Sequence, residues 1–278
     1  MLEEGKRAQT QVIVLIAIVI LGSCLGNLSQ TALNAMFSGM AADFGVQMEL
    51  GQWVTTLYML VLGITVPAVT YLMRRFPLKN VVLAALLLLV VGAAIDVVAP
   101  SFEVLVAGRA LQAVSAGITM PMMISIVMTS FPRDKQATVM GIAGIAMGFA
   151  PNIGPTIGGW MIGFAGWRSF FVALFACALV LLLLAAVLVA RRPQANLSAR
   201  LDVLSLVLSA LGFGGLLLGF SNASSFGLAS PYIWAPAILG VLFLALYLHR
   251  QRRIEHPLTN LHIFDSWRYR VSFWAANA

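Results

Sequence analysis

Asp96 and Arg109 are the two charged residues that fall well inside long apolar stretches of the sequence. An arginine at the centre of a membrane-spanning helix costs roughly 2.5 to 3.5 kcal/mol on insertion scales, so Arg109 should face a protein interior and not lipid. The alternative is an arginine that extends to the outer membrane interface, because Arg109 follows the start of its stretch at Val104 closely. We favour the interior position.

Asp96 lies near the end of the preceding apolar stretch, at a depth that would allow contact with Arg109. A neighbouring cation would keep this carboxylate ionised, whereas apolar surroundings would let it carry a proton. The simpler interpretation is an aspartate that caps the outer turn beside Pro100, and the sequence favours this cap.

Glycine and proline are concentrated in the segment Gly141 to Trp160, which reads GIAGIAMGFAPNIGPTIGGW. Pro151 and Pro155 each remove a helix hydrogen bond, so a bend is expected here. Glycines at four-residue spacing place small residues on one helix face and permit close helix contact. These glycines are Gly144 and Gly148, and then Gly154 and Gly158. Gly159 directly follows Gly158.

The elements that carry these residues are predicted to be membrane-spanning helices. The chain has 278 residues, of which 60% are hydrophobic and 10% charged, and its mean hydropathy is +0.94. Apolar runs of about 20 residues cross a bilayer as helices, which satisfy their own backbone hydrogen bonds. We predict an all-α polytopic membrane protein with eight full spans, at residues 12–28, 53–73, 81–98, 104–128, 139–164, 170–190, 203–220 and 233–248.

The distribution of basic residues predicts that the amino terminus is cytoplasmic. With this orientation 15 of the 17 lysines and arginines fall on the inner side, Arg168 lies outside and Arg109 lies in a span. Because the positive charge follows the loops, it indicates a membrane topology and not nucleic-acid binding. Lys6 and Arg7 before the first apolar run also fit a signal peptide, but seven further spans and the lack of a cleavage site favour a retained helix.

Loop lengths and composition divide the chain into two helical parts. Residues 1–10 form a cytoplasmic amino terminus, 11–190 a bundle of six antiparallel spans, and 191–202 a polar, basic linker. Residues 203–249 form an additional helix pair. Residues 250–270 are expected to be a cytoplasmic connection, and 271–278 the start of a ninth helix, where the chain stops.

The segment Gly141 to Trp160 resembles the antiporter motif in the fifth helix of drug:proton exporters of the major facilitator superfamily. Three other segments agree with this family and its fourteen-helix branch. GQWVTTLYML at 51–60 is similar to the start of the second helix, and GRALQAVSAG at 108–117 is similar to the fourth-helix motif. IEHPLTNLHIF at 254–264 is similar to the segment before the ninth helix. The resemblance covers most of the chain and implies that it is the amino-terminal portion of such a protein.

The resemblance also implies roles for individual residues. Arg109 would take part in proton coupling, and we add Asp96 as its candidate partner. Pro151, Pro155 and the five glycines named above would shape the antiporter motif, and a cytoplasmic gating loop would contain Arg74, Arg75 and Lys79. The substrate cavity at the membrane midplane would be lined from this part of the chain by Gln30, Asn34, Trp53, Thr56, Tyr58, Gln112 and Met120.

Two departures from the family pattern bear on these roles. The first helix in this family often carries an aspartate, but LSQTALN places Ser29 there, so a proton-carrying carboxylate is missing. Of the loop pattern after the second helix, only Arg75 matches. These departures resemble the lincomycin-resistance subgroup of the family.

The function we expect is proton-coupled export of small hydrophobic or cationic compounds, with this chain an incomplete portion of the transporter. The alternatives are a membrane fragment without transport activity and a facilitator or importer of a small metabolite. The expected partners are the lipid bilayer, substrates, protons and either a missing carboxy-terminal bundle or a second copy. No enzyme motif and no cofactor are indicated, and His249, His256 and His262 lack the cysteines or carboxylates that would support a metal site.

Overall fold

The structure, a computed structural model, describes residues 2–190, 202–222 and 230–254. Within these residues it contains eight α-helices, each long and apolar enough to cross a membrane, and no strand. The predicted all-α class with eight spans is therefore confirmed. The expected start of a ninth helix at 271–278 lies outside the described residues. The helices are α1 (Leu2–Phe44), α2 (Glu49–Arg75), α3 (Leu78–Val98), α4 (Phe102–Ser130), α5 (Arg133–Ala165), α6 (Trp167–Leu188), α7 (Val203–Ser221) and α9 (Pro231–Gln251).

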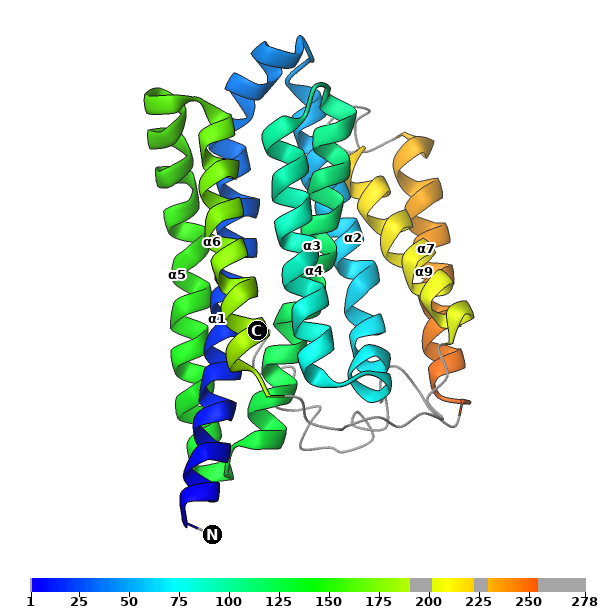
Figure 1. Cartoon of the computed structure of the whole chain (residues 1–278). Helices are drawn as coiled ribbons and strands as arrows, with labels where there is room; N and C mark the ends of the chain where they lie inside the picture. Colours follow the sequence, from blue (N-terminus) through cyan, green and yellow to red (C-terminus); the bar gives the residue numbers. More distant parts are fainter. Residues whose placement is uncertain (1, 191–201, 223–229, 255–278) are drawn as a thin grey trace. The chain divides into compact units, whose positions relative to one another are not determined.

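Helix α1 is longer than hydropathy predicts. The apolar run stops at Leu28, but the helix continues to Phe44 and runs along the whole bundle in Figure 1. The extension is helical because its apolar side chains pack inward. Leu33, Met36 and Met40 are fully buried, in one cluster with residues of α4 and α6. Polar residues between them lower the mean hydropathy without breaking the helix.

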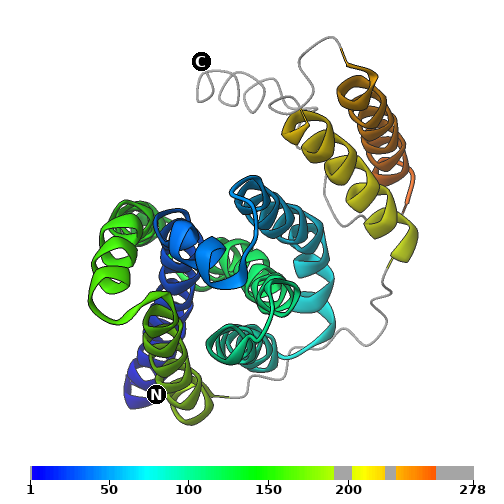
Figure 2. The same ribbon diagram turned by 90° about the horizontal axis from the view of Figure 1, so that it is seen from above.

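The chain divides into two compact units, residues 1–198 and 199–278. In the first unit, α5, α1, α4 and α2 form a row, and α6 and α3 pack along one side of it, as the view from above shows (Figure 2). Helix α1 contacts α5, α4 and α6, and α3 contacts α4 and α6. The interior of this unit therefore lies between α1, α3, α4 and α6.

An aromatic and ionic cluster joins the end of α1 to the connection between α5 and α6. Trp167 Nε1 donates to Asp43 Oδ2 at 2.8 Å, and Arg168 Nη1 donates to the same oxygen at 3.2 Å. Arg168 Nη2 also donates to the Ala99 carbonyl at 3.2 Å. Gly166 at φ 77° makes the sharp turn that brings Trp167 and Arg168 to this place. The sequence did not predict this cluster, because contacts between residues 69 to 125 positions apart leave no local pattern.

The second unit is built on the close contact of α7 with α9. A Cβ atom on Gly215 would lie 2.6 Å from the Pro236 carbonyl oxygen, and one on Gly240 would lie 2.8 Å from the Gly212 carbonyl oxygen. Only glycine permits this approach of two helix backbones.

At the start of α7, the Asp202 carboxyl accepts hydrogen bonds from Arg250 and Ser205. Burial opposes ionisation of Asp202, but these hydrogen bonds outweigh burial and lower the pKa of its carboxyl below the ordinary value.

Candidate functional site

A hydrogen-bonded network in the interior of the first unit contains both intramembrane charges. Arg109 Nη1 donates to Ser29 Oγ at 2.6 Å and to Gln112 Oε1 at 2.7 Å, and Ser29 Oγ donates to the same Gln112 oxygen at 2.9 Å. Gln112 Nε2 donates to Asp96 Oδ2 at 2.6 Å. The amide of Gln112 therefore connects the carboxylate on α3 with the guanidinium on α4 and the hydroxyl on α1.

Close packing of α3 against α4 encloses this network. A Cβ on Gly92 would lie 2.6 Å from the Gly108 carbonyl oxygen, and a Cβ on Gly108 would collide with the Asp96 carboxylate. Asp96, Arg109, Gln112 and Ser29 are each at most 1% exposed. The site is therefore enclosed by protein, where charged and polar groups depend on hydrogen-bond partners close to them.

Tyr58 covers the guanidinium from the side of α2. The Arg109 Cζ atom lies 4.7 Å from the centroid of the Tyr58 ring, a cation–π distance. The Tyr58 hydroxyl donates to the Gly26 carbonyl on α1 at 3.5 Å. Through this contact the network involves all four helices α1, α2, α3 and α4.

Two polar atoms of the network have no hydrogen-bond partner among the described residues, namely Asp96 Oδ1 and Arg109 Nε. Buried polar atoms without partners are uncommon and often mark functional positions. A carboxylate with one oxygen bonded to Gln112 and the other free can accept a proton on the free oxygen without breaking the existing bond. The arrangement can therefore store a proton next to a fixed cation.

The structure decides between the alternatives for both charges. Arg109 lies inside the bundle and does not extend to the outer interface. Asp96 directs its carboxylate to Gln112 and does not cap the outer turn at Pro100. Ser29, which the sequence analysis treated as the loss of a carboxylate, is the hydroxyl that contacts Arg109. Proton coupling by these residues remains a prediction.

The residues predicted to line the substrate cavity fall into two groups. Gln112 and Tyr58 are at most 1% exposed and belong to the enclosed network, so they do not line an open surface here. The others lie at the surface of the row formed by α1, α2 and α4. On α1 Gln30 is half-buried and Asn34 exposed, on α2 Trp53 is exposed and Thr56 half-buried, and on α4 Met120 is exposed.

Polar contacts between α1 and α2 occur at this second group. Thr55 Oγ1 donates to Asn34 Oδ1 at 3.4 Å, and Gln30 Nε2 donates to the Met59 sulfur at 3.5 Å. Gln30 directly follows Ser29, so the α1 surface and the buried network are adjacent along one helix. The sequence analysis did not single out Thr55 or Met59.

The predicted antiporter motif on α5 has two faces. A Cβ on Gly158 would lie 2.8 Å from the Ala32 carbonyl oxygen of α1, and a Cβ on Gly154 would lie 2.9 Å from the Leu28 carbonyl oxygen. In contrast, no atom lies within 4 Å of a Cβ placed on Gly144, Gly148 or Gly159. Pro151 is half-buried and Pro155 exposed. One face therefore joins α5 to α1, and the other has no helix of the first unit against it.

Asn152, between the two prolines, is a residue that the sequence analysis missed. Its side-chain Nδ2 donates to the Gly148 carbonyl at 2.7 Å, and the residue is exposed. Proline residues remove backbone donors from this stretch, and Asn152 adds one donor back. The polar character of an asparagine in an apolar span was the available signal.

The predicted gating loop connects α2 with α3. Lys79 Nζ donates to the Ala186 carbonyl near the end of α6 at 2.6 Å, so it holds the start of α3 against that helix. Arg74 is exposed at the last turn of α2, followed by Arg75.

Of the three histidines, His249 lies at the end of α9, whereas His256 and His262 lie outside the described residues. Within the part of the chain that the structure describes, no group of three metal-ligating side chains occurs.

A family model described as Major Facilitator Superfamily matches residues 19–250. The chain is 35% identical over 251 residues to the uncharacterized MFS-type transporter YcnB of Bacillus subtilis, covering 90% of this chain and 53% of the relative. It is 34% identical to the lincomycin resistance protein LmrB of the same organism, with 92% and 54% covered. To a multidrug resistance protein B homolog of Mycobacterium tuberculosis it is 30% identical, with 90% and 46% covered.

Solved transporters share the fold. A crystal structure of the peptide transporter POT superposes with a TM-score of 0.63 at 14% identity, covering 87% of this chain and 53% of that one. A D-xylose–proton symporter superposes with a TM-score of 0.53 at 11% identity, with 85% and 67% covered. The chain spans about half the length of the curated relatives it matches.

Proposed function

The chain belongs to the major facilitator superfamily, and from this we propose that it is the amino-terminal part of a proton-coupled exporter of small hydrophobic or cationic compounds. Membership in this family indicates a transporter and not an enzyme. Relatives named for lincomycin and multidrug resistance support export of drugs as the activity. The observation that carries the proposal is the buried network of Asp96, Gln112, Arg109 and Ser29, which has a free carboxylate oxygen.

The network supports coupling because one amide joins its members. A proton on Asp96 Oδ1 would neutralise the carboxyl group and weaken the hydrogen bond that Asp96 Oδ2 accepts from Gln112 Nε2. The Oε1 atom of the same amide accepts hydrogen bonds from Arg109 and Ser29, so the change reaches α4 and α1. On α1 the next residue, Gln30, belongs to the surface that we assign to substrate. In this proposal, proton uptake at α3 alters the helix that contacts the exported compound.

We also propose a position for the substrate site on the same helices. Transporters with two bundles bind substrate near the membrane midplane, between the bundles. We assign the exposed surface around Gln30, Asn34 and Trp53 to this site, with the aromatic ring and the amides suited to flat, hydrophobic or cationic compounds. The second half of the site would come from a second bundle.

The first experiment compares the chain alone with a joined transporter. We define the joined transporter as this chain followed by a second six-helix bundle, encoded downstream of codon 278 or taken from a relative. In proteoliposomes with an imposed pH gradient, the joined transporter should move protons when lincomycin or ethidium is added. The chain alone should insert but show no such movement, because alternating access needs two bundles.

Either of two results would contradict this proposal. Substrate-dependent proton movement by the chain alone would show that it works without a second bundle, for example as a homodimer. Uptake of a small metabolite by the joined transporter, with no response to drugs, would favour the alternative of a facilitator or importer.

We also propose that the chain lies in a bacterial cytoplasmic membrane with its amino terminus inside. Reporter fusions in the connections of the first unit should then alternate between outside and inside, in the order Gly45, Pro77, Phe102, Lys135 and Gly166. The physical reason is the excess of lysine and arginine in the connections predicted to be inside. Two consecutive fusions that report the same side would disprove this topology.

A further inference from the structure

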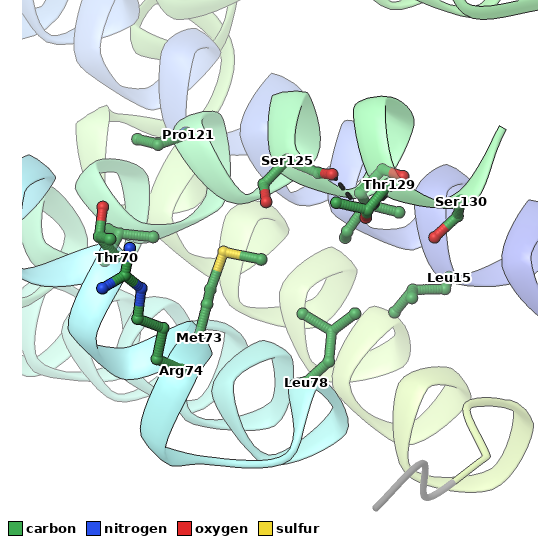
Figure 3. A pocket seen from close by; sticks show the side chains of 11 residues that line it. Leu15, Thr70, Met73, Arg74, Leu78, Pro121, Ser125, Thr129 and Ser130 are labelled. Carbon is green, nitrogen blue, oxygen red and sulfur yellow. Dashed lines mark hydrogen bonds between the residues drawn. The ribbon is translucent and has the colours of Figure 1, made fainter. Parts of the chain in front are cut away.

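A pocket of about 500 Å³ opens between the last turns of α2 and α4 (Figure 3). It is separate from the buried network and from the proposed substrate surface. Thr70 and Arg74 line it from α2, and Ser125 and Ser130 line it from α4. Figure 3 shows the two sets facing each other across the opening, with the guanidinium of Arg74 beside Thr70.

The course of the two helices explains why a pocket forms here. At Gly117 they are in close contact, since a Cβ on Gly117 would lie 3.0 Å from the Leu62 carbonyl oxygen of α2. Pro121 follows one turn later and removes a hydrogen bond from α4, as Pro67 does in α2. Beyond these prolines the lining of the space between the helices includes the small hydroxyl side chains of Thr70, Ser125 and Thr129.

The pocket is positively charged and has an apolar floor. Within the described residues Arg74 makes no hydrogen bond or ion pair, and no acidic side chain lines the pocket. By apolar floor we mean the apolar side chains that line the pocket, namely Leu15, Val69, Met73, Leu78, Pro121 and Ile126. Arg74 lies at the end of its span, the level at which lipid headgroups meet water. A cation and hydroxyl groups above an apolar floor fit a molecule with a phosphate at one end and a hydrocarbon chain at the other.

We propose that this pocket binds the phosphate of an anionic membrane lipid. Arg74 would bind the phosphate oxygens through its guanidinium, and Thr70 and Ser125 would donate hydrogen bonds to the same oxygens. The acyl chain would lie against the apolar floor. Basic pockets between membrane-spanning helices are a common way to bind acidic headgroups. This inference does not depend on the proposed transport function.

Lipid retention by the purified chain tests the proposal. The chain is placed in detergent micelles with equal amounts of phosphatidylglycerol and phosphatidylcholine, and bound lipid is counted by native mass spectrometry. We expect phosphatidylglycerol to be retained preferentially, and Arg74→Gln to lower its retention about tenfold, since a charge-assisted contact to phosphate is lost. The control Arg133→Gln removes an exposed cation at the same end, outside the pocket, and should change retention less than about twofold.

A further variant keeps the test decisive if Arg74→Gln folds poorly. Thr70→Val preserves both shape and charge and should lower retention about threefold through one lost hydrogen bond. Equal retention of both lipids by the unmodified chain would overturn the proposal. Equal losses in Arg74→Gln and Arg133→Gln would also overturn it, because they would indicate diffuse attraction. Displacement of the lipid by inorganic phosphate alone would rule out the lipid as the occupant.

Discussion

Arg109→Ala is expected to destabilise the six-helix bundle by about 3 kcal/mol, and Asp96→Asn in the same chain is expected to recover part of that loss. The substitution removes the donor that bonds Ser29 and Gln112 and leaves the Asp96 carboxylate buried without a cation. Asp96→Asn alone keeps an acceptor for Gln112 and should cost less. Membrane insertion should proceed in all three variants, because removing a charge from a span lowers the cost of insertion.

Thermal denaturation of the purified chain in detergent measures this cycle. The double variant should be more stable than Arg109→Ala alone, with a coupling free energy of about 1 kcal/mol or more. Arg168→Ala is the matched control, because its side chain is 43% exposed and its ion pair with Asp43 should contribute less than about 1 kcal/mol. Purely additive effects of the Arg109 and Asp96 substitutions would show that the two charges do not interact.

Gly158→Val is expected to disrupt the first unit, whereas Gly148→Val, ten residues earlier on the same helix, should leave its stability nearly unchanged. The Gly158 face touches the α1 backbone, so a side chain there must push α1 and α5 apart. Overpacking of this kind typically costs about 1 to 3 kcal/mol, and backbone contacts leave little room for relaxation. At Gly148 no atom lies within 4 Å of an added Cβ.

In the joined transporter, Gly148→Val should have a large effect on transport although it has little effect on stability. Gly148→Val should fold but transport poorly, because we propose that the open glycine face of α5 packs against the second bundle. Thermal denaturation of the chain alone measures how much each substitution lowers stability and so distinguishes the two faces. Drug-dependent proton movement by the joined transporter then measures the role of the open face. Equal destabilisation of the chain by both substitutions, or normal transport by Gly148→Val, would contradict the division of the motif into two faces.

Hydropathy was sufficient to predict the number of spans, because lipid contact demands long apolar runs. It failed at the second half of α1, where residues such as Ser29 and Asn34 lower the mean hydropathy. Ser29 contacts Arg109 inside the bundle, and the exposed Asn34 accepts a hydrogen bond from Thr55 of α2, so both have partners on another helix. Hydropathy therefore identified the lipid-facing parts of the spans better than the interior parts.

The site was predictable only in part, since its contacts depend on how the helices are rotated about their axes. The sequence indicated that Arg109 should be buried, because an unpaired arginine in lipid is costly. It did not indicate that Asp96 faces Gln112, because a small rotation of α3 would direct the same carboxylate to the outer turn. The same limit applied to α5, where glycine spacing predicted close contact but not which glycines contact α1.

Drug-dependent proton movement by the Asp96→Asn form of the joined transporter is the most direct test of the proposed coupling. The unmodified joined transporter and an Asp43→Asn control, which changes an exposed aspartate outside the network, are measured beside it in proteoliposomes at equal protein content. We predict that Asp96→Asn reduces proton movement to the level of empty vesicles, while Asp43→Asn retains it. Normal proton movement by a folded Asp96→Asn protein would show that the buried network does not carry the coupled proton.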